Sequence, residues 1–399
     1  MKVLITTDWY LPAVNGVVTS VINLQRYLEK RGVEVKILTL SDNGETYWDG
    51  NVLYLASVNA SRIYPGARAH FHPFDKNLLE LIAWDPDIVH SQCEFSTFLP
   101  ARRIAKACGC PQIHTYHTLY EDFVRYISPN AALGKRGAQV LTKYTCRRVD
   151  RIIAPTAKTK DVLERYGIAT PVTCIPTGIC LDKYSPEMSQ EEKSALRESL
   201  GIGDEEKILM FLGRMAAEKR PDEILSMFAR ADVKNCRLMF VGDGPFRPEL
   251  EALTERLGVQ DKVIFTGMID PRDVPKYYMM GDVFVSASRS ETQGLTYIEA
   301  MASGLPLLCR KDPCLDGVLI PGVNGFDFTY EEEFDRALRT LLGSEELMKK
   351  MGRRSRELAS EKFSAEAFGR AVLRVYRAEL GQSSPETRRK IYGTAQTAC

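Results

Sequence analysis

Hydrophobic positions along the chain follow two alternating patterns, which predict strands interleaved with helices. Short apolar runs indicate strands, and stretches in which apolar residues recur every three or four positions indicate helices. The helical spacing runs from Val17 to Leu28, Gly32 ends that helix, and another helix is predicted over 131–148. Strands are predicted at 2–6, 33–40, 52–55, 87–91, 111–115 and 151–154. This order is typical of a parallel sheet with helices on both faces.

The same pattern starts again after 171–186, a segment punctuated by proline and glycine. Pro221 suits the first turn of a helix over 221–231, and the last part of the chain is helical and charged. The second set of strands is predicted at 207–212, 237–241, 262–266, 282–286 and 306–309. We therefore predict an α/β protein with two doubly wound parallel-sheet domains, at 1–172 and 173–364.

Composition limits the classes of protein that this pattern fits. The 399 residues are 44% hydrophobic and 26% charged, as in an ordinary globular protein. The 53 basic and 52 acidic side chains nearly balance, so we predict no nucleic-acid partner. No apolar run is long enough for a transmembrane helix, and the first strand is too short for a signal peptide. Because the ten cysteines are scattered without a CxxC pair, we predict a cytoplasmic protein with reduced thiols and no zinc site.

Two polar segments of the first half follow predicted strands, where open parallel sheets bind ligands. The loop from Asp8 to Gly16 leads into a helix whose amides can bind phosphate, but it lacks the GxGxxG pattern of dinucleotide sites, and an ordinary turn explains it equally well. His114 and His117 end one strand on opposite faces, so only one of them can reach a cleft. The segment Asp85-Pro86-Asp87 has the spacing of a DxD metal motif, but its proline favours a turn, and we predict no metal there.

Several polar features of the second half also lie where predicted strands end. Arg214 and Lys219 follow the first strand, and an arginine fork with a mobile lysine suits a diphosphate. Gly242 begins a glycine-rich turn that permits close approach of a ligand. Glu291 and Glu299 stand eight positions apart, one in a loop and one in a helix, where they can hold different parts of one ligand. Taken singly, each feature also fits a solvated loop or an ordinary turn.

Basic residues are concentrated between 100 and 151, a segment that contains ten lysines and arginines and three acidic residues. The helix at 131–148 and its end contribute Lys135, Arg136, Lys143, Arg147 and Arg148 to this region. Its predicted apolar side is formed by Val140, Leu141, Tyr144 and Val149. A basic amphipathic helix of this kind can lie on an anionic membrane surface. A helix packed on its own sheet with a solvated basic rim fits the same pattern, and the sequence favours neither interpretation.

The order of these motifs resembles that of the retaining glycosyltransferases of family 4, which have the GT-B fold of two facing Rossmann-like domains. The resemblance spans nearly the whole chain and is carried by Gly16, Gly213-Arg214, Glu218-Lys219, Gly242-Asp243-Gly244-Pro245, Phe265-Thr266-Gly267, Glu291 and Glu299. It implies that no metal or other cofactor is required, because cationic side chains and helix ends stabilise the leaving diphosphate. It also implies that a final helix, within about 365–399, crosses back to the first domain.

The same resemblance implies roles in binding a nucleotide-sugar donor. Arg214 and Lys219 neutralise the diphosphate, and Glu299 binds the ribose hydroxyls. Glu291 holds the donor sugar and His117 lies beside it, so these two are the implied catalytic residues. The remaining implied donor-binding positions are Gly16, Gly242, Met268, Gln293, Gly294 and Leu295. Since no carboxylate is placed as a nucleophile, front-face transfer with retention is expected.

A narrower resemblance concerns the acceptor. The segments 16–20, 114–123 and 291–297 are similar to those of bacterial diacylglycerol glucosyltransferases, which transfer glucose from UDP-glucose to the free hydroxyl of 1,2-diacylglycerol. This resemblance implies a peripheral enzyme that binds anionic lipids at the inner face of the cell membrane. Cys180 and Gln92 depart from the residues usual in the family and bear on acceptor choice. The alternative is a family 4 enzyme with another donor or acceptor, such as a phosphatidylinositol mannosyltransferase or a cell-wall glycan enzyme.

Overall fold

The computed structural model describes residues 1–61, 66–72, 75–122, 130–184 and 188–382. It divides into two compact units, one formed by Met1–Gly178 with Ala365–Cys399 and the other by Ile179–Ser364. The first unit extends beyond the expected boundary at 172, because strand β10 (Val172–Cys174) pairs with the first sheet. Helix α13 (Ala365–Gln382) also belongs to this unit, and the rest of the predicted final segment lies outside the described residues.

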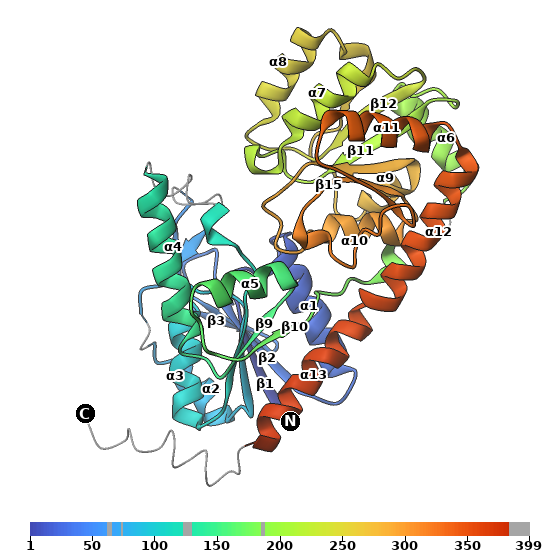
Figure 1. Cartoon of the computed structure of the whole chain (residues 1–399). Coiled ribbons are helices and arrows are strands. Elements are labelled where there is room, and N and C mark those ends of the chain that lie inside the picture. The colour runs from blue at the N-terminus through green and yellow to red at the C-terminus, as the bar shows by residue number, and fades with distance from the viewer. Residues whose placement is uncertain (62–65, 73–74, 123–129, 185–187, 383–399) are drawn as a thin grey trace. The chain divides into compact units, whose positions relative to one another are not determined.

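The first unit contains an eight-stranded sheet with the order β10-β9-β8-β7-β1-β2-β4-β3 (Figure 1). Its other strands are β1 (Lys2–Thr6), β2 (Glu34–Leu40), β3 (Tyr47–Asp49), β4 (Val52–Leu55), β7 (Ile88–Ser91), β8 (Gln112–Thr115) and β9 (Arg151–Ala154). Only the β3–β4 pair is antiparallel among the described pairs of this sheet. A separate two-stranded ribbon joins β5 (Val58–Asn59) to β6 (Arg68–Ala69). All six predicted strands are confirmed, and the additional strands are too short to show a hydrophobic period.

Helices cover both faces of this sheet. They are α1 (Gly16–Glu29), α2 (Leu78–Trp84), α3 (Phe98–Cys108), α4 (Ala131–Cys146), α5 (Ala157–Arg165) and α13. Because successive residues of a strand point to opposite faces, Val3 and Ile5 pack in a core with α1 and α13, whereas Leu4 packs with α2 and α3. Figure 1 shows α1 and α13 side by side on their face.

The second unit contains six parallel strands in the order β13-β12-β11-β14-β15-β16. They are β11 (Lys207–Leu212), β12 (Cys236–Val241), β13 (Val263–Phe265), β14 (Val283–Ser286), β15 (Leu307–Arg310) and β16 (Gly325–Phe328). The helices are α6 (Gln190–Ser199), α7 (Pro221–Ala231), α8 (Arg247–Leu257), α9 (Val274–Met280), α10 (Leu295–Ala302), α11 (Glu331–Leu342) and α12 (Glu345–Lys362). Ile208 faces a core shared with α10 and α12, and Leu209 faces one shared with α7 and α11. Two sheets, one parallel and one parallel except for its β3–β4 pair, are covered by helices and confirm the predicted fold class.

A buried histidine fastens α13 to the first sheet. His90 on β7 is fully buried, with Nδ1 2.6 Å from the Tyr376 hydroxyl of α13 and Nε2 2.7 Å from the Thr115 hydroxyl of β8. Burial lowers the pKa of His90 well below its ordinary value, and the charges of His114 and His117 would lower it further. His90 is therefore neutral in the folded protein at neutral pH.

Because His90 is buried in its neutral form, we expect the free energy of unfolding to fall in mild acid. The unfolded chain protonates His90 near its ordinary pKa of 6.5 and the folded chain does not, so stability is complete above that pH and declines below it. One such group changes the unfolding free energy by up to about 1.4 kcal/mol per pH unit. In urea unfolding at about pH 7 and about pH 5, His90→Gln should lose less stability between the two conditions than the wild type. His72→Gln, at an exposed side chain, is the control, and equal losses in wild type and H90Q would contradict the prediction.

Candidate functional site

Four loops leave the same edge of the second sheet. Since all its strands are parallel, the loops after β13, β12, β11 and β14 emerge side by side at their carboxyl ends. These loops carry Met268, Gly242, Arg214 and Glu291, respectively. The chain order reverses between β11 and β14, and such a reversal is where open α/β sheets bind ligands. The topology therefore places the predicted donor-binding residues of this unit along one binding edge.

The two predicted cations of this edge are both held by carboxylates. Arg214 Nη2 lies 2.8 Å from Glu218 Oε1, and Lys219 Nζ lies 2.5 Å from Glu291 Oε1. The Ser288 hydroxyl donates to the same Glu291 oxygen over 3.1 Å. Each of the two cations at this edge thus forms an ion pair with a carboxylate. The fold brings Lys219 and Glu291 together although 72 positions separate them in the chain.

The loop after β14 ends in Gly294, a position that has no room for a side chain. Gly294 precedes α10 with φ +73°, and a Cβ added there would lie 2.4 Å from the Tyr297 ring. This turn directs the amino end of α10 toward the edge, with buried Gln293 before it and Leu295 as the first helical residue. An amino end carries partial positive charge, which favours a phosphate or another anion.

Backbone contacts fix the neighbouring loops to one another. Gly242 has φ +121°, and a Cβ there would lie 2.5 Å from the carbonyl oxygen of Gly213. Its amide donates to the carbonyl of Gly267 over 3.1 Å, and Met268 follows with a side chain that is 79% exposed. Glycine at 242 thus allows the β12 loop to lie directly on the β11 loop that carries Arg214.

Glu299 lies in α10 and is held by two tyrosines that the sequence did not indicate. Its Oε1 accepts the Tyr184 hydroxyl over 2.8 Å, and its Oε2 accepts the Tyr278 hydroxyl over 2.9 Å. Burial raises the pKa of Glu299, and the two tyrosine hydrogen bonds oppose that rise. Tyr184 and Tyr278 come from separate elements, so no local pattern links them to Glu299.

In the first unit, the two histidines that end β8 have different surroundings. His114 is fully buried, with Nε2 3.1 Å from Glu94 Oε1, whereas His117 is partly exposed. His117 Nε2 lies 2.7 Å from Gln92 Oε1, and burial lowers its pKa to about 3, so its ring is neutral at neutral pH. Gly16 begins α1, where the Asn15 side chain accepts the Val18 amide over 3.0 Å. The sequence predicted neither the Asn15 cap nor the Gln92 contact.

Both units of this chain are similar in sequence to known protein families. The family model described as Glycosyltransferase Family 4 matches residues 14–183, and the one described as Glycosyl transferases group 1 matches residues 192–358. Alpha-monoglucosyldiacylglycerol synthase of Streptococcus pneumoniae is 36% identical over 94% of this chain and 85% of its own length. The chain belongs to glycosyltransferase family 4. The enzyme of the same name from Acholeplasma laidlawii is 30% identical over 94% of this glycosyltransferase and 96% of its own length.

Solved structures show the same GT-B fold. Sucrose-phosphate synthase from Thermosynechococcus elongatus superposes with a TM-score of 0.74 over 96% of this glycosyltransferase and all of its own chain, at 20% identity. HepE from Anabaena, solved in complex with UDP-glucose, gives a TM-score of 0.72 over 95% of this chain and all of its own, at 16% identity. These structures show two Rossmann-like domains, and the family membership identifies the protein as a hexosyltransferase.

Helix α4 of the glycosyltransferase has an apolar stripe that does not face its own core. Thr142, Thr145 and Cys146 are buried, whereas an exposed apolar stripe consists of Leu133, Val140 and Tyr144, which are 65%, 67% and 42% exposed. The stripe differs from the predicted apolar side, because Val149 is a core residue after the helix and Leu141 is partly buried. The basic residues are exposed at Lys135, Arg136, Arg147 and Arg148 and partly buried at Lys143, with Arg147 and Arg148 following the end of the helix.

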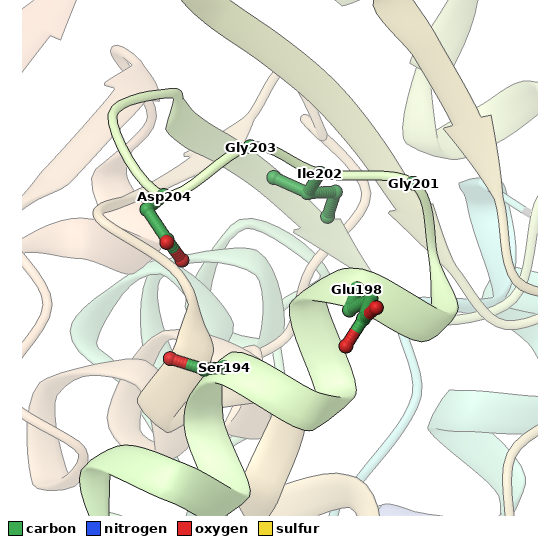
Figure 2. Close-up of a pocket in the computed structure, with 6 residues that line it drawn as sticks. All are labelled: Ser194, Glu198, Gly201, Ile202, Gly203 and Asp204. Atoms are coloured by element: carbon green, nitrogen blue, oxygen red, sulfur yellow. The ribbon is translucent and has the colours of Figure 1, made fainter.

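Figure 2 shows a surface pocket of the second unit, and none of the candidate site residues lines it. Its lining comes from α6 and the loop that leads to β11, namely Ser194, Glu198, Gly201, Ile202, Gly203 and Asp204. It lies where β11 begins, at the opposite edge of the sheet from Arg214 and Lys219. Open α/β sheets bind ligands at the carboxyl ends of strands, so this pocket is not the candidate site.

Three further properties of the described part of the enzyme bear on its chemistry. The nine cysteines within it are free. Among the same residues, no three His, Cys, Asp or Glu side chains converge in a way that could hold a metal ion. Every helix described there falls short of the length and apolar character needed to cross a bilayer. Metal independence itself stays a prediction, which a chelator can test.

Proposed function

We propose that this enzyme transfers glucose from UDP-glucose to the free hydroxyl of 1,2-diacylglycerol and forms alpha-monoglucosyldiacylglycerol. The observation that carries the proposal is the presence of two ion pairs, Arg214–Glu218 and Lys219–Glu291, at the sheet edge where α10 begins. It supplies the cations and the dipole that a leaving diphosphate requires, with a carboxylate next to them for the sugar. Two relatives that match nearly the whole chain are named for synthesis of this lipid, which supports the acceptor.

In the proposed reaction, the residues of the second unit stabilise the charge that develops on the departing UDP. Arg214 and Lys219 exchange their carboxylate partners for phosphate oxygens, and the amino end of α10 adds its amides. Glu291 is held by Lys219 and Ser288 at the edge, where it orients sugar hydroxyls rather than attacking the sugar. We therefore propose front-face transfer with retention and without a metal. The roles that the family resemblance implies for His117 and Gly16 stay predictions.

We further propose that the enzyme works as a peripheral protein on the cytoplasmic face of the membrane, where its acceptor resides. The exposed apolar stripe of α4 supports this location, because Leu133, Val140 and Tyr144 can enter the headgroup region while the basic residues around them contact anionic lipids. The alternative packing of this stripe on the enzyme's own sheet is not favoured, since a different side of the helix is buried.

The decisive experiment is transfer of labelled glucose from UDP-glucose to diacylglycerol in mixed micelles that contain anionic lipid. We expect a monoglucosyl lipid whose anomeric configuration matches that of the donor, with the rate unchanged by EDTA. GDP-mannose and phosphatidylinositol are tested in parallel, because a phosphatidylinositol mannosyltransferase is the alternative within the family. Activity with that pair and none with UDP-glucose and diacylglycerol would overturn the proposal.

Removing positive charge from the last turn of α4 and the two arginines that follow it should weaken membrane binding without changing donor binding. Neutralising Lys143, Arg147 and Arg148 together removes roughly 1 kcal/mol of lipid attraction for each residue near the surface. In sedimentation with anionic vesicles, we expect the bound fraction of this triple variant to fall sharply while its UDP affinity stays unchanged. The same neutralisation of Lys349 and Lys350 on α12 is the control. Unchanged vesicle binding by the triple variant would assign its basic residues to a solvated rim.

A further inference from the structure

The carboxylate of Glu299 differs from the other carboxylates of the site in its partners. Glu218 and Glu291 each contact a cation, whereas the hydrogen bonds to Glu299 among the described residues come from two uncharged tyrosine hydroxyls. Tyr184 donates to Oε1 and Tyr278 donates to Oε2, so each oxygen has one tyrosine partner. The same side chain remains partly exposed, so a ligand can reach it.

Three elements of the second unit hold this arrangement. Tyr184 ends the short 3₁₀ helix η3 (Leu181–Tyr184), Tyr278 lies in α9, and Glu299 lies in α10. Both tyrosines belong to the buried core, and their rings meet edge-to-face with centroids 5.9 Å apart. Because both rings are packed, their hydroxyls have fixed positions. A flexible glutamate side chain between two fixed donors loses most of its rotational freedom.

We propose that Tyr184 and Tyr278 are positioning residues for Glu299, and that they orient its carboxylate to accept the two ribose hydroxyls of the donor nucleotide. This inference rests on the proposed function, together with the ribose-binding role that the family resemblance implies for Glu299. A carboxylate oxygen accepts about two hydrogen bonds, so one tyrosine on each oxygen leaves about one acceptor position on each. Two neighbouring acceptor positions match the two neighbouring hydroxyls of a ribose.

The tyrosines, together with the charge of Lys183, also favour the charged form of this acceptor. Burial alone raises the pKa of Glu299, and a protonated carboxyl would offer the ribose one acceptor fewer. Hydrogen bonds from Tyr184 and Tyr278 favour the ionised form without neutralising it. A cation in their place would compete with the ribose for the same oxygens, as Lys219 does at Glu291. Uncharged donors therefore suit an acceptor that must remain available.

The test is the preference of the full-length enzyme for a ribonucleotide over its deoxy form. Calorimetry compares UDP with 2′-deoxy-UDP, and GDP with 2′-deoxy-GDP, for wild type, Tyr184→Phe, Tyr278→Phe and Glu299→Gln. Because a hydrogen bond to a charged group is strong, we expect the wild type to prefer the ribose form by roughly tenfold or more. Each Tyr→Phe variant should lose most of this preference, and E299Q should lose it as well. Tyr277→Phe, the neighbouring tyrosine of α9, is the matched control and should keep it.

The preference is a readout that a merely structural role would not move. A tyrosine that only stabilises the core would lower the melting temperature of its variant and leave the ratio of the two affinities at the wild-type value. Wild-type preference in both Tyr→Phe variants would overturn the inference, whatever their stability. Failure of the proposed function would give a different result. The enzyme would then transfer no glucose to diacylglycerol but would still prefer UDP or GDP over the deoxy form. A wild type without any ribose preference would overturn the inference directly.

Discussion

Lys219→Ala should lower kcat/KM for glucosyl transfer by roughly 10²–10³-fold, the usual effect of removing one group that stabilises developing charge. Lys219 is the ammonium group that lies beside Glu291 at the carboxyl edge of the second sheet. In the reaction it would contact the diphosphate, whose negative charge grows as the bond to the sugar breaks. Its loss therefore raises the barrier to transfer more than it weakens binding of the intact donor. Steady-state kinetics with UDP-glucose measures both effects.

Two comparisons separate this role from a general effect of charge. Lys276→Ala removes a surface lysine of the same unit that pairs with Asp273, and it should leave kcat/KM unchanged. Lys219→Arg keeps the charge but replaces a compact ammonium with a planar fork, so it should restore only part of the activity. A Lys219→Ala variant with wild-type kcat/KM and a normal melting temperature would show that Lys219 does not take part in transfer.

Much of the fold could be predicted because the central strands have clear hydrophobic periods. Runs such as Lys207–Leu212 are buried on both faces, and a continuous apolar run between polar loops identifies such a strand without further information. The strands that escaped prediction have two to four residues, among them Val58–Asn59 and Gly325–Phe328. A strand of two residues, such as Val58–Asn59, has no period of its own and forms because a neighbouring strand offers hydrogen bonds.

The convergence of the candidate donor-binding residues could be predicted for a different reason. Arg214, Gly242 and Glu291 lie in the loops that follow three strands, and parallel strands all end at one edge, so the order of elements brings these residues together. The partners of Glu299 could not be predicted in this way. Tyr184 lies 115 positions from Glu299, and no strand end links them. Only packing of three separate elements brings the hydroxyls to the carboxylate.

Tertiary packing also explains why the predicted apolar side of α4 differs from the observed one. The spacing of apolar residues indicated an amphipathic helix, but it did not indicate which side of the helix is buried. Small residues, Thr142 and Cys146 among them, face the core, and the larger Val140 and Tyr144 remain exposed. A hydrophobic pattern identifies an apolar side, whereas the tertiary structure decides what covers it. Exposed large apolar residues on a helix with basic neighbours are therefore the stronger indication of a surface partner.

Glu291→Gln should reduce kcat by roughly 10²-fold or more while UDP binds at least as tightly as to the wild type. The reason for the second effect is the ion pair, because Glu291 Oε1 lies 2.5 Å from the Lys219 ammonium that the diphosphate needs. UDP must displace this carboxylate, and a glutamine of the same shape competes less strongly. Single-turnover transfer and calorimetry with UDP measure the two effects separately. Glu198→Gln, at an exposed acid in the pocket of Figure 2, is the control and should change neither.

A double variant shows whether the effect on UDP passes through Lys219. If Glu291 weakens UDP binding by occupying the lysine, then Glu291→Gln should tighten UDP binding in the wild-type background and have no such effect in Lys219→Ala. An equal gain in both backgrounds would mean that the carboxylate repels the diphosphate through space and not through the pair. A loss of UDP affinity as large as the loss of kcat would place Glu291 on the nucleotide rather than on the sugar. If UDP binding tightens only in the background that retains Lys219, the ion pair has a function, because it keeps both charges paired until the diphosphate of the donor replaces the carboxylate.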